Sequence, residues 1–231
     1  MAKAKLLYDY TEAKKELERI DALDYSGFEL VYKVWKTETN PTEDDTIEFS
    51  TKFVEGFKNR PSVRISGETK TKADRVIDQV IRGRIKNITD KRLDDIRFAH
   101  KISMGAENII GAILEEYIQW ALWKYGWSIC WGNCFKAVDL CSREGKLIQI
   151  KNKSNTENSS SNKIRVGTEI QKWYRMNANT GVFCWDKLMQ MTKCPNGTLS
   201  EEQFEGFARL LINKNQKALY VDENELQAFL S

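Results

Sequence analysis

The sequence predicts an α/β (α+β) protein in which a mixed central sheet is flanked by helices and preceded by an added, mainly helical N-terminal region. Residues 103–125 place apolar side chains at three- and four-residue spacing without a proline, which is typical of a long amphipathic helix. Short segments rich in β-forming residues follow this helix and are separated by polar turns. From residue 103 we therefore expect the order helix, strand, strand, strand, helix, strand.

Three strands are expected at residues 127–131, 135–141 and 146–153. The last two are joined by the polar link Ser-Arg-Glu-Gly, whose final Gly145 favours a hairpin. The spacing of Thr168 and Gln171 matches a capping box and predicts a helix over residues 168–179, followed by a buried strand at residues 182–185. A second capping box at residues 200–203 predicts a C-terminal helix, and residues 218–221 can add a last strand.

The N-terminal part is expected to begin with a helix over residues 11–24 that starts at a Thr cap. Residues 28–35 are rich in β-formers and predict a strand, and the acids Glu43, Asp44 and Asp45 are placed in a solvated loop after it. We divide the chain into an N-terminal helical, DNA-contacting region (residues 1–102) and a core (residues 103–231), or treat both as one continuous domain.

One helix in this region combines an apolar face with many Lys and Arg residues. The apolar side is expected to pack inward, and the basic side is either a solvated surface or a surface that contacts phosphates. The apolar positions at helical spacing are Val76, Ile77, Val80, Ile81 and Ile85.

Composition narrows the class of protein. The net charge of the 231 residues is +3, so the total charge gives no evidence for nucleic-acid binding and local clusters must carry that argument. No signal peptide and no run of about twenty apolar residues is found, which predicts a cytoplasmic protein; the resemblance described below places it in the prokaryotic cytosol. The five cysteines are expected to be reduced. The single histidine, His100, excludes nucleases that need several histidines.

The predicted hairpin carries a carboxylate, a carboxamide and an amine, which are Asp139, Gln149 and Lys151. Gln149 and Lys151 are two residues apart and share one face of a strand, and the carbonyl of Ile150 between them is a further possible ligand. Mg2+ prefers such oxygen ligands, and a lysine beside the metal can orient water and stabilise charge on phosphorus. The pattern indicates a metal-dependent nuclease, although an exposed hairpin with solvated polar residues is the simpler alternative.

These residues and the order of elements around them resemble the PD-(D/E)xK nuclease superfamily, whose core is an αβββαβ unit. The resemblance covers about residues 103–186 and implies that Asp139 and the Gln149-Ile150-Lys151 element form the catalytic and Mg2+-binding motif. Val138 stands in place of the motif's proline, and Gln149 replaces the usual second acid in a QxK variant.

The superfamily often adds a glutamate from the preceding helix, and residues 111–115 resemble that element. The resemblance implies that Glu115 is a catalytic and metal-binding residue. Helix spacing favours Glu115 over Glu116 without excluding Glu116, and a plain surface acid is the alternative for either.

The polar stretch after the hairpin is rich in side chains that bind bases and phosphates, which predicts DNA contact; a flexible surface loop is the alternative. Residues 150–165 together with residues 167–175 are also similar to the SinI-like group of type II restriction endonucleases, which cut GGWCC-type sites. The candidate DNA-binding residues are Asn152, Lys153, Ser154, Asn155, Asn158, Ser159, Ser160, Ser161, Asn162, Lys163, Arg165, Lys172 and Arg175.

The resemblance implies a sequence-specific type II restriction endonuclease that hydrolyses double-stranded DNA with Mg2+ and leaves 5'-phosphates. It also implies a homodimer and a cognate DNA methyltransferase that is not a stable subunit. Two alternatives stay open. One is a structure-specific repair or recombination nuclease, and the other is a non-catalytic DNA-binding protein on the same fold.

Overall fold

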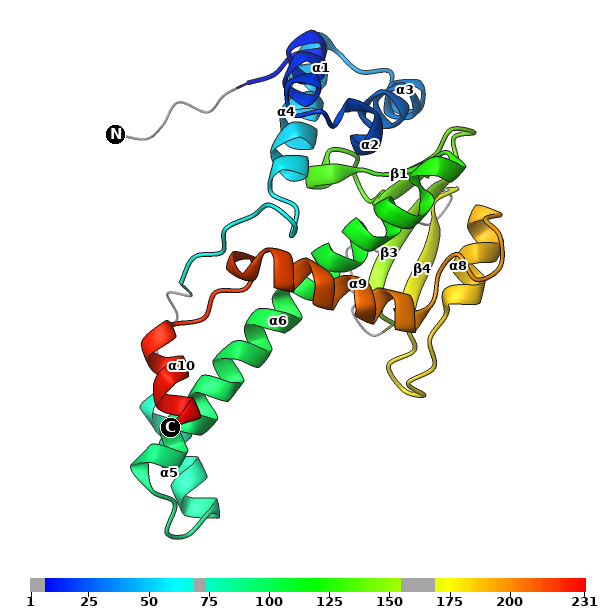
Figure 1. Cartoon of the computed structure of the whole chain (residues 1–231). Coiled ribbons are helices and arrows are strands. Elements are labelled where there is room, and N and C mark those ends of the chain that lie inside the picture. Colours follow the sequence, from blue (N-terminus) through cyan, green and yellow to red (C-terminus); the bar gives the residue numbers. More distant parts are fainter. Residues whose placement is uncertain (1–6, 69–73, 155–168) are drawn as a thin grey trace.

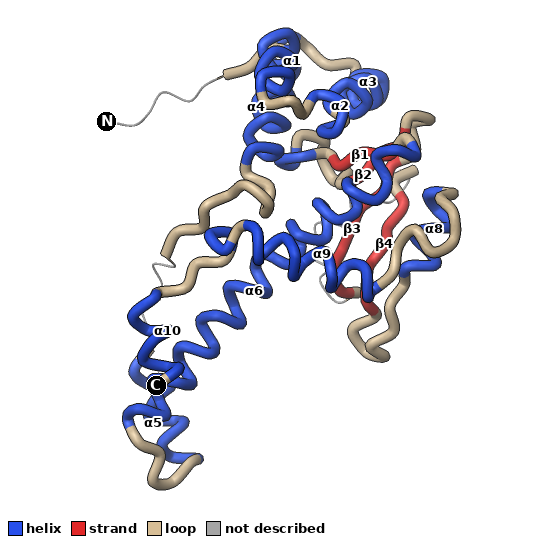
Figure 2. Tube along the Cα trace, viewed as in Figure 1, coloured by secondary structure: helices blue, strands red, loops and turns tan. Residues whose placement is uncertain are grey.

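The computed structural model describes residues 7–68, 74–154 and 169–231 (Figure 1). Four strands form one mixed sheet, and helices make up most of the rest of the described chain (Figure 2). The expected α+β class is confirmed at this level. The expected helix over residues 103–125 forms the C-terminal part of a much longer helix that lies along the sheet (Figure 1).

The sheet has the order β1 (Trp127–Ile129), β2 (Leu140–Ser142), β3 (Leu147–Lys153) and β4 (Gln171–Met176). β1, β2 and β3 are antiparallel neighbours, whereas β4 is parallel to β3. Between β2 and β3 the N–H of Ser142 donates to the carbonyl of Lys146 at 2.9 Å, and Gly145 has a φ of +81°, which residues with a Cβ rarely adopt. The predicted hairpin is therefore confirmed, with a shorter first strand than expected.

The prediction of a helix over residues 168–179 is wrong for its described part, because residues 171–176 form β4. Its side chains alternate between exposed or intermediate and buried positions, and fully buried Trp173 pairs with Ile150 of β3. The capping-box signal depends only on residues within the segment. Pairing with β3 gives the backbone of residues 171–176 hydrogen-bond partners from a distant part of the chain, and this outweighs the local signal. Thr168 lies outside the described residues.

The expected strand at residues 182–185 is reduced to one antiparallel bridge between Met176 and Phe183. Trp185 instead begins α8 (Trp185–Thr192), and its ring packs at 5.3 Å from that of Trp173. The predicted C-terminal helix is α9 (Glu201–Lys214), and its N-cap Ser200 accepts a hydrogen bond from the N–H of Gln203. No strand forms at residues 218–221: Ala218 ends η3 (Gln216–Ala218), and residues 219–221 connect it to α10 (Glu223–Leu230).

The N-terminal helices are α1 (Tyr10–Arg19), α2 (Leu23–Ser26), α3 (Phe28–Thr39) and α4 (Glu43–Lys58). The strand prediction for residues 28–35 is wrong. Phe28, Val31, Val34 and Trp35 are all buried and are spaced by three, three and one residues, which places them on one face of a helix. The β-forming character of these residues is overridden because that face packs on aromatic residues of α4, such as Phe49.

Helix starts in this region differ from the expected ones. The N-cap of α1 is Asp9, which forms a capping box with Glu12, and Thr11 is already inside the helix. The three acids expected in a loop lie in the first turn of α4, where Asp45 completes a capping box with Thr42. Carboxylates stabilise a helix at this end because the unpaired N–H groups carry positive partial charge.

The N-terminal helices are joined to the sheet region by a very close backbone contact between α4 and η2 (Trp131–Asn133). A Cβ added to Gly56 would lie 2.2 Å from the backbone nitrogen of Gly132, and one added to Gly132 would lie 2.0 Å from the carbonyl oxygen of Lys52. Only glycine at both positions permits this approach. The buried side chains of both regions belong to one hydrophobic cluster.

The long helix is α6 (Asp90–Leu122), which ends in η1 (Trp123–Tyr125). It runs without interruption across the boundary between residues 102 and 103 that we drew from the sequence. The N-terminal part of α6 extends away from the sheet together with α5 (Arg75–Arg84), and α10 packs beside it (Figure 1). Among the described residues, no helix is both long and apolar enough to span a bilayer.

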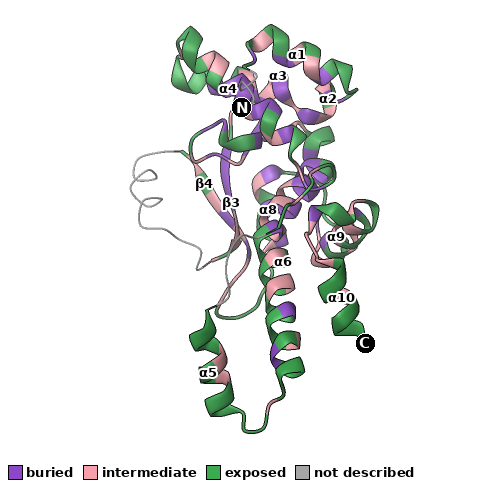
Figure 3. Ribbon diagram, turned by 90° about the vertical axis from the view of Figure 1, so that its left-hand side faces the viewer, coloured by how far each residue is buried: buried purple, intermediate pink, exposed green. Residues whose placement is uncertain are grey.

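Helix α5 forms where its periodicity predicted, but the expectation that its apolar side packs inward is wrong. None of its residues is buried, and Figure 3 shows it in the colours of exposed and intermediate residues. The reason is that its polar side faces α6, through ion pairs described below.

We expect replacement of Gln119 with Leu to lower the free energy of unfolding by about 3 kcal/mol, because it leaves two buried backbone groups unpaired. The Gln119 amide donates to the carbonyl of Tyr25 at 2.6 Å and accepts from the N–H of Ile129 at 2.7 Å, so it links α2, α6 and β1. Urea unfolding measures the loss. The control Gln190→Leu changes an exposed residue of α8, and an equal effect of both variants would contradict this role of Gln119.

Candidate active site

Asp139 is held at the start of β2 by three hydrogen bonds. Its carbonyl accepts from the N–H of Cys130 at 2.8 Å, and its N–H donates to the carbonyl of Ile148 at 3.0 Å. The carboxylate oxygen Oδ2 accepts from the N–H of Ile150 at 2.7 Å. The carboxylate is therefore fixed against the strand that carries Gln149 and Lys151.

A tight turn before Asp139 was not anticipated from the sequence, which predicted a continuous strand there. The N–H of Val138 donates to the carbonyl of Phe135 at 3.2 Å, and Ala137 has a φ of +62°. This region is unfavourable for a residue with a Cβ and is maintained only when surrounding contacts require it. The turn ends the preceding segment and brings Asp139 into register with β3.

β3 presents the two other predicted residues. Ile148 and Ile150 belong to the hydrophobic core, and Gln149 and Lys151 alternate with them and share the opposite face. Gln149 is buried and Lys151 is partly buried. The backbone of β3 thus presents the amide and the amine on one face, as the spacing predicted.

Glu115 of α6 lies within electrostatic reach of this group. Burial, followed by the nearby Asp139 carboxylate, raises the pKa of the Glu115 carboxyl, and the Lys151 ammonium opposes the rise, so that the pKa is about 8. Two carboxyl groups and one amine therefore lie near one another. Each comes from a different element: Glu115 from α6, Asp139 from the turn before β2, and Lys151 from β3.

Glu116, the alternative to Glu115, has a different environment. Its carboxylate accepts a hydrogen bond from the N–H of Ser62 at 2.9 Å and lies 3.4 Å from Nε of Arg60. Burial raises its pKa, and the Ser62 hydrogen bond and Arg60 oppose the rise. Glu116 thus ties α6 to the end of the N-terminal helices and lies away from Asp139.

Lys172 brings a second amine to the same face of the sheet. Its Cα pairs with that of Gln149 in the parallel register, so Lys172 lies beside the Gln149 and Lys151 pair. Burial lowers the pKa of the Lys172 ammonium, and the positive charge of Lys151 lowers it further. The sequence had placed Lys172 on a helix, so its position next to Lys151 could not be read from spacing.

The structure describes five of the residues that we proposed for DNA binding. Lys153 is exposed at the end of β3, whereas Ser154 is bound to the chain through its N–H to the carbonyl of Met176 and through its hydroxyl, which accepts from the N–H of Ala178. The remaining candidates lie outside the described residues: Asn155, Asn158, Ser159, Ser160, Ser161, Asn162, Lys163 and Arg165.

Arg175 is buried, and its guanidinium binds other residues of the chain in the protein interior. Its Nε donates to Oδ1 of Asn152 at 2.9 Å, and its guanidinium forms an ion pair with Glu201 at the start of α9. The guanidinium also lies 5.2 Å from the ring centroid of Phe204. Arg175 and Asn152 therefore connect β3, β4 and α9, a role that the proposed DNA contact did not anticipate.

The donor set at the site fits a hard divalent cation. It consists of the carboxyl groups of Asp139 and Glu115, the amide of Gln149 and the carbonyl of Ile150, all of which offer oxygen. The Asp139 carboxylate contributes to the raised pKa of Glu115, and a cation bound between the two carboxyl groups would offset their repulsion. In the described ranges, no group of three or more His, Cys, Asp or Glu residues could hold a metal ion, so the amide and the carbonyl would have to complete the set.

Comparison with known proteins gives consistent matches. A family model described as SinI restriction endonuclease matches residues 31–214. The type II restriction enzyme Eco47I of Escherichia coli is 41% identical over 128 residues, which are 53% of this chain and 55% of that enzyme. The type II restriction enzyme SinI of Salmonella infantis is 35% identical over 133 residues, 55% of this chain and 57% of that enzyme. The matched part spans little more than half of either relative.

The raised pKa of Glu115 makes the stability of the metal-free protein depend on pH. Between the ordinary pKa of 4.5 and about 8, the folded protein holds a proton that the unfolded chain has released, so stability falls as pH rises through this window. Each unit of pKa shift corresponds to at most about 1.4 kcal/mol. In the presence of a chelator, we expect the free energy of unfolding to fall less for Glu115→Gln than for the wild-type chain as the pH rises from 5 to 8.

Urea unfolding at several pH values tests this dependence. The control Glu107→Gln changes an exposed carboxylate on the same helix and should keep the wild-type pH profile. Parallel profiles for wild type and Glu115→Gln would show that the proton is not held at Glu115.

Proposed function

The chain belongs to the SinI restriction endonuclease family, and on that premise we propose that it is a type II restriction endonuclease that hydrolyses specific sites in double-stranded DNA. The observation that carries the proposal is the convergence of Glu115, Asp139 and Lys151. These groups come from three elements, and all three lie inside the part of the chain that the family model covers.

We assign the core to the PD-(D/E)xK superfamily in its QxK form. A helix followed by three antiparallel strands and a fourth strand parallel to the third supports this assignment, because the acid directly precedes the second strand and the QxK element lies on the third. Gln149 replaces an acid, so Asp139 and Glu115 would supply both negative charges of the site.

In the proposed reaction, Asp139, Glu115, Gln149 and the carbonyl of Ile150 would hold Mg2+, which would neutralise charge at the scissile phosphate and lower the pKa of the attacking water. The ammonium of Lys151 stabilises the charge that builds on the phosphate oxygens and orients the attacking water. Water attacks phosphorus opposite the 3' oxygen, the P–O3' bond breaks, and the products are a 5'-phosphate and a 3'-hydroxyl.

Substrate binding is proposed to use the face that carries Lys151 and Lys172. The Lys151 charge contributes to the lowered pKa of Lys172, and a phosphate between the two ammonium groups would offset their repulsion. Lys153, exposed where the chain leaves β3, extends this positive edge. Recognition of a GGWCC-type sequence is proposed for the segment that follows.

Cleavage of both strands of such a site needs two catalytic centres, so we propose that the enzyme acts as a homodimer on a near-palindromic sequence. A cognate DNA methyltransferase would protect the host DNA without being a stable subunit.

Incubation of phage DNA with the chain and Mg2+, followed by sequencing of the ends, tests the proposal. Discrete fragments with 5'-phosphates are expected. A smear of fragments would favour a nuclease that recognises DNA structure. No turnover at any Mg2+ concentration, with DNA binding intact, would favour a non-catalytic binder, for which the replacement of an acid by Gln149 is the supporting feature.

We expect Lys151→Ala to lower the cleavage rate by at least about 100-fold, because the charge that builds up in the transition state loses the Lys151 ammonium. DNA binding, measured by fluorescence anisotropy in Ca2+, should stay within a few-fold of wild type, since one phosphate contact among many is lost. Lys146→Ala is the matched control, because Lys146 is an exposed lysine of the same hairpin. Full Mg2+-dependent cutting by Lys151→Ala would refute the assignment.

The adjacent residues Glu115 and Glu116 should have different roles, the first in cleavage and the second in stability. We expect Glu115→Gln to abolish most cleavage while the protein stays folded, since it removes a charge from the site. Glu116→Gln should instead lower the melting temperature, because buried Arg60 loses its carboxylate partner. Cleavage assays at a temperature where both variants are folded compare them, and the opposite pattern would reassign the metal ligand to Glu116.

A further inference from the structure

Helix α5 packs on α6 with its polar side. Asp78 forms an ion pair with Arg97 of α6, and Arg82 forms one with Asp90 at the start of α6. Asp78 and Arg82 are four residues apart and therefore share one face of α5. These two contacts determine which side of the helix faces the rest of the chain.

The apolar residues of α5 lie on the other side. At 100° per residue, Val80 is about 160° away from both Asp78 and Arg82, and the neighbouring apolar positions cluster around it. We call this set the α5 stripe: Val76, Ile77 and Val80. The stripe faces away from α6, whereas an amphipathic helix normally buries its apolar face against the rest of the protein.

The exposure of the α5 stripe is large. Val76 is 65% exposed, Ile77 is 58% exposed and Val80 is 66% exposed. An isolated helix of ten residues is only marginally stable in water, and two ion pairs whose arginines are exposed to solvent add little. An apolar partner on the stripe would supply the stabilisation that the helix lacks within its own chain.

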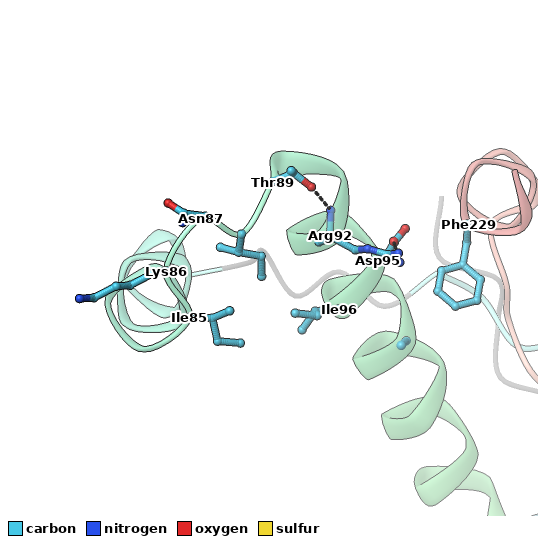
Figure 4. Close-up of a pocket in the computed structure, with 10 residues that line it drawn as sticks. Ile85, Lys86, Asn87, Thr89, Arg92, Asp95, Ile96 and Phe229 are labelled. Atoms are coloured by element: carbon cyan, nitrogen blue, oxygen red, sulfur yellow. Dashed lines mark hydrogen bonds and ion pairs between the residues drawn. The ribbon is translucent and has the colours of Figure 1, made fainter.

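More apolar surface lies at the C-terminal end of the helix, on the side that faces α6. There Ile85 faces Ile96 of α6 across a shallow groove that Phe229 of α10 also lines (Figure 4). Ile85 and Phe229 are 49% and 41% exposed. Exposed apolar side chains gathered on one small element are typical of protein contact sites on soluble proteins.

We propose that the α5 stripe is the contact surface between two copies of this chain, with the two α5 helices packed antiparallel across a two-fold axis. The partner in this proposal rests on the proposed function, because cleavage of both DNA strands needs two chains. The position of α5 at the end of an extension away from the sheet leaves it accessible to a second chain (Figure 1).

The charges at the two ends of α5 favour this self-pairing. Asp74 caps the N-terminal end, and Arg84 lies at the C-terminal end, seven residues after Ile77 and therefore in line with the stripe. In an antiparallel pair, Asp74 of each helix meets Arg84 of the other, and the aliphatic residues meet between them. Such a surface is complementary to itself, as a two-fold interface requires. DNA is a poorer occupant, because the stripe is aliphatic and phosphates need cations.

Sedimentation velocity of the full chain, without DNA and over a range of protein concentrations, tests the proposal. We expect a dimer, and we expect Val80→Glu to weaken dimerisation at least tenfold, because it buries two like charges at the centre of the interface. The control Val182→Glu changes a residue with 60% exposure that precedes α8, and it should leave the dimer unchanged. Thermal unfolding should show that both variants fold, since neither side chain is buried.

A second measurement does not depend on destabilising the contact. Val80→Cys should form an intermolecular disulfide on mild oxidation much faster than Val182→Cys, and the five native cysteines are present in both variants. Equal rates for the two variants would overturn the proposal. A wild-type chain that is monomeric with and without DNA, or a Val80→Glu variant that dimerises like wild type, would also overturn it.

Cleavage assays on the same variants separate this proposal from the proposed function. A dimer that Val80→Glu disrupts, in a protein that cuts no DNA, supports the interface and refutes the endonuclease. Sequence-specific cutting by a Val80→Glu variant that still dimerises supports the endonuclease and refutes the interface.

Discussion

The hydrogen bonds of Asp139 join the sheet and the candidate site into one structure. Its backbone carbonyl and N–H pair with the residue after β1 and with β3, so Asp139 is part of the ladder that orders three strands. Its carboxylate accepts from the N–H of Ile150, on the strand that presents Gln149 and Lys151. The same residue thus holds the sheet in register and directs a carboxylate to the position where chemistry is proposed. The strained φ of Ala137 is maintained because these bonds surround it.

The second constraint is electrostatic. Glu115 is brought beside Asp139 by α6, whose buried side is held by packing and by the hydrogen bonds of Gln119. In the absence of a cation the cost of two nearby carboxylates is avoided by retaining a proton on Glu115 near neutral pH. The scaffold therefore stabilises an arrangement that is unfavourable on its own, and a bound divalent cation and a phosphate would offset the repulsion.

Two ion pairs between arginine and glutamate, outside the candidate site, have a purely structural role and differ from the charged groups of the site. Arg175 with Glu201 and Arg60 with Glu116 each place one cation and one anion in a buried pair. At the candidate site the charges do not form one-to-one pairs, because two carboxyl groups lie near the Lys151 ammonium and Lys172 adds a second ammonium beside Lys151. Two neighbouring carboxyl groups are stabilised by a bound cation, whereas an arginine paired with a glutamate needs no further ligand. This contrast distinguishes Glu115 from Glu116 in physical terms.

The sequence by itself determined the features that depend on neighbours in the chain. The hairpin around Gly145, the shared face of Gln149 and Lys151, the helix through Glu115 and the Ser200 cap all follow from short-range spacing. Only the tertiary structure decided which partner each face meets. Residues 28–35 became a helix because their buried face packs on α4, and residues 171–176 became a strand because β3 offered a parallel edge. The direction of the α5 stripe was likewise set by two ion pairs to α6. Periodicity specifies that a face is apolar, but contacts between distant segments specify whether that face is buried, and against what.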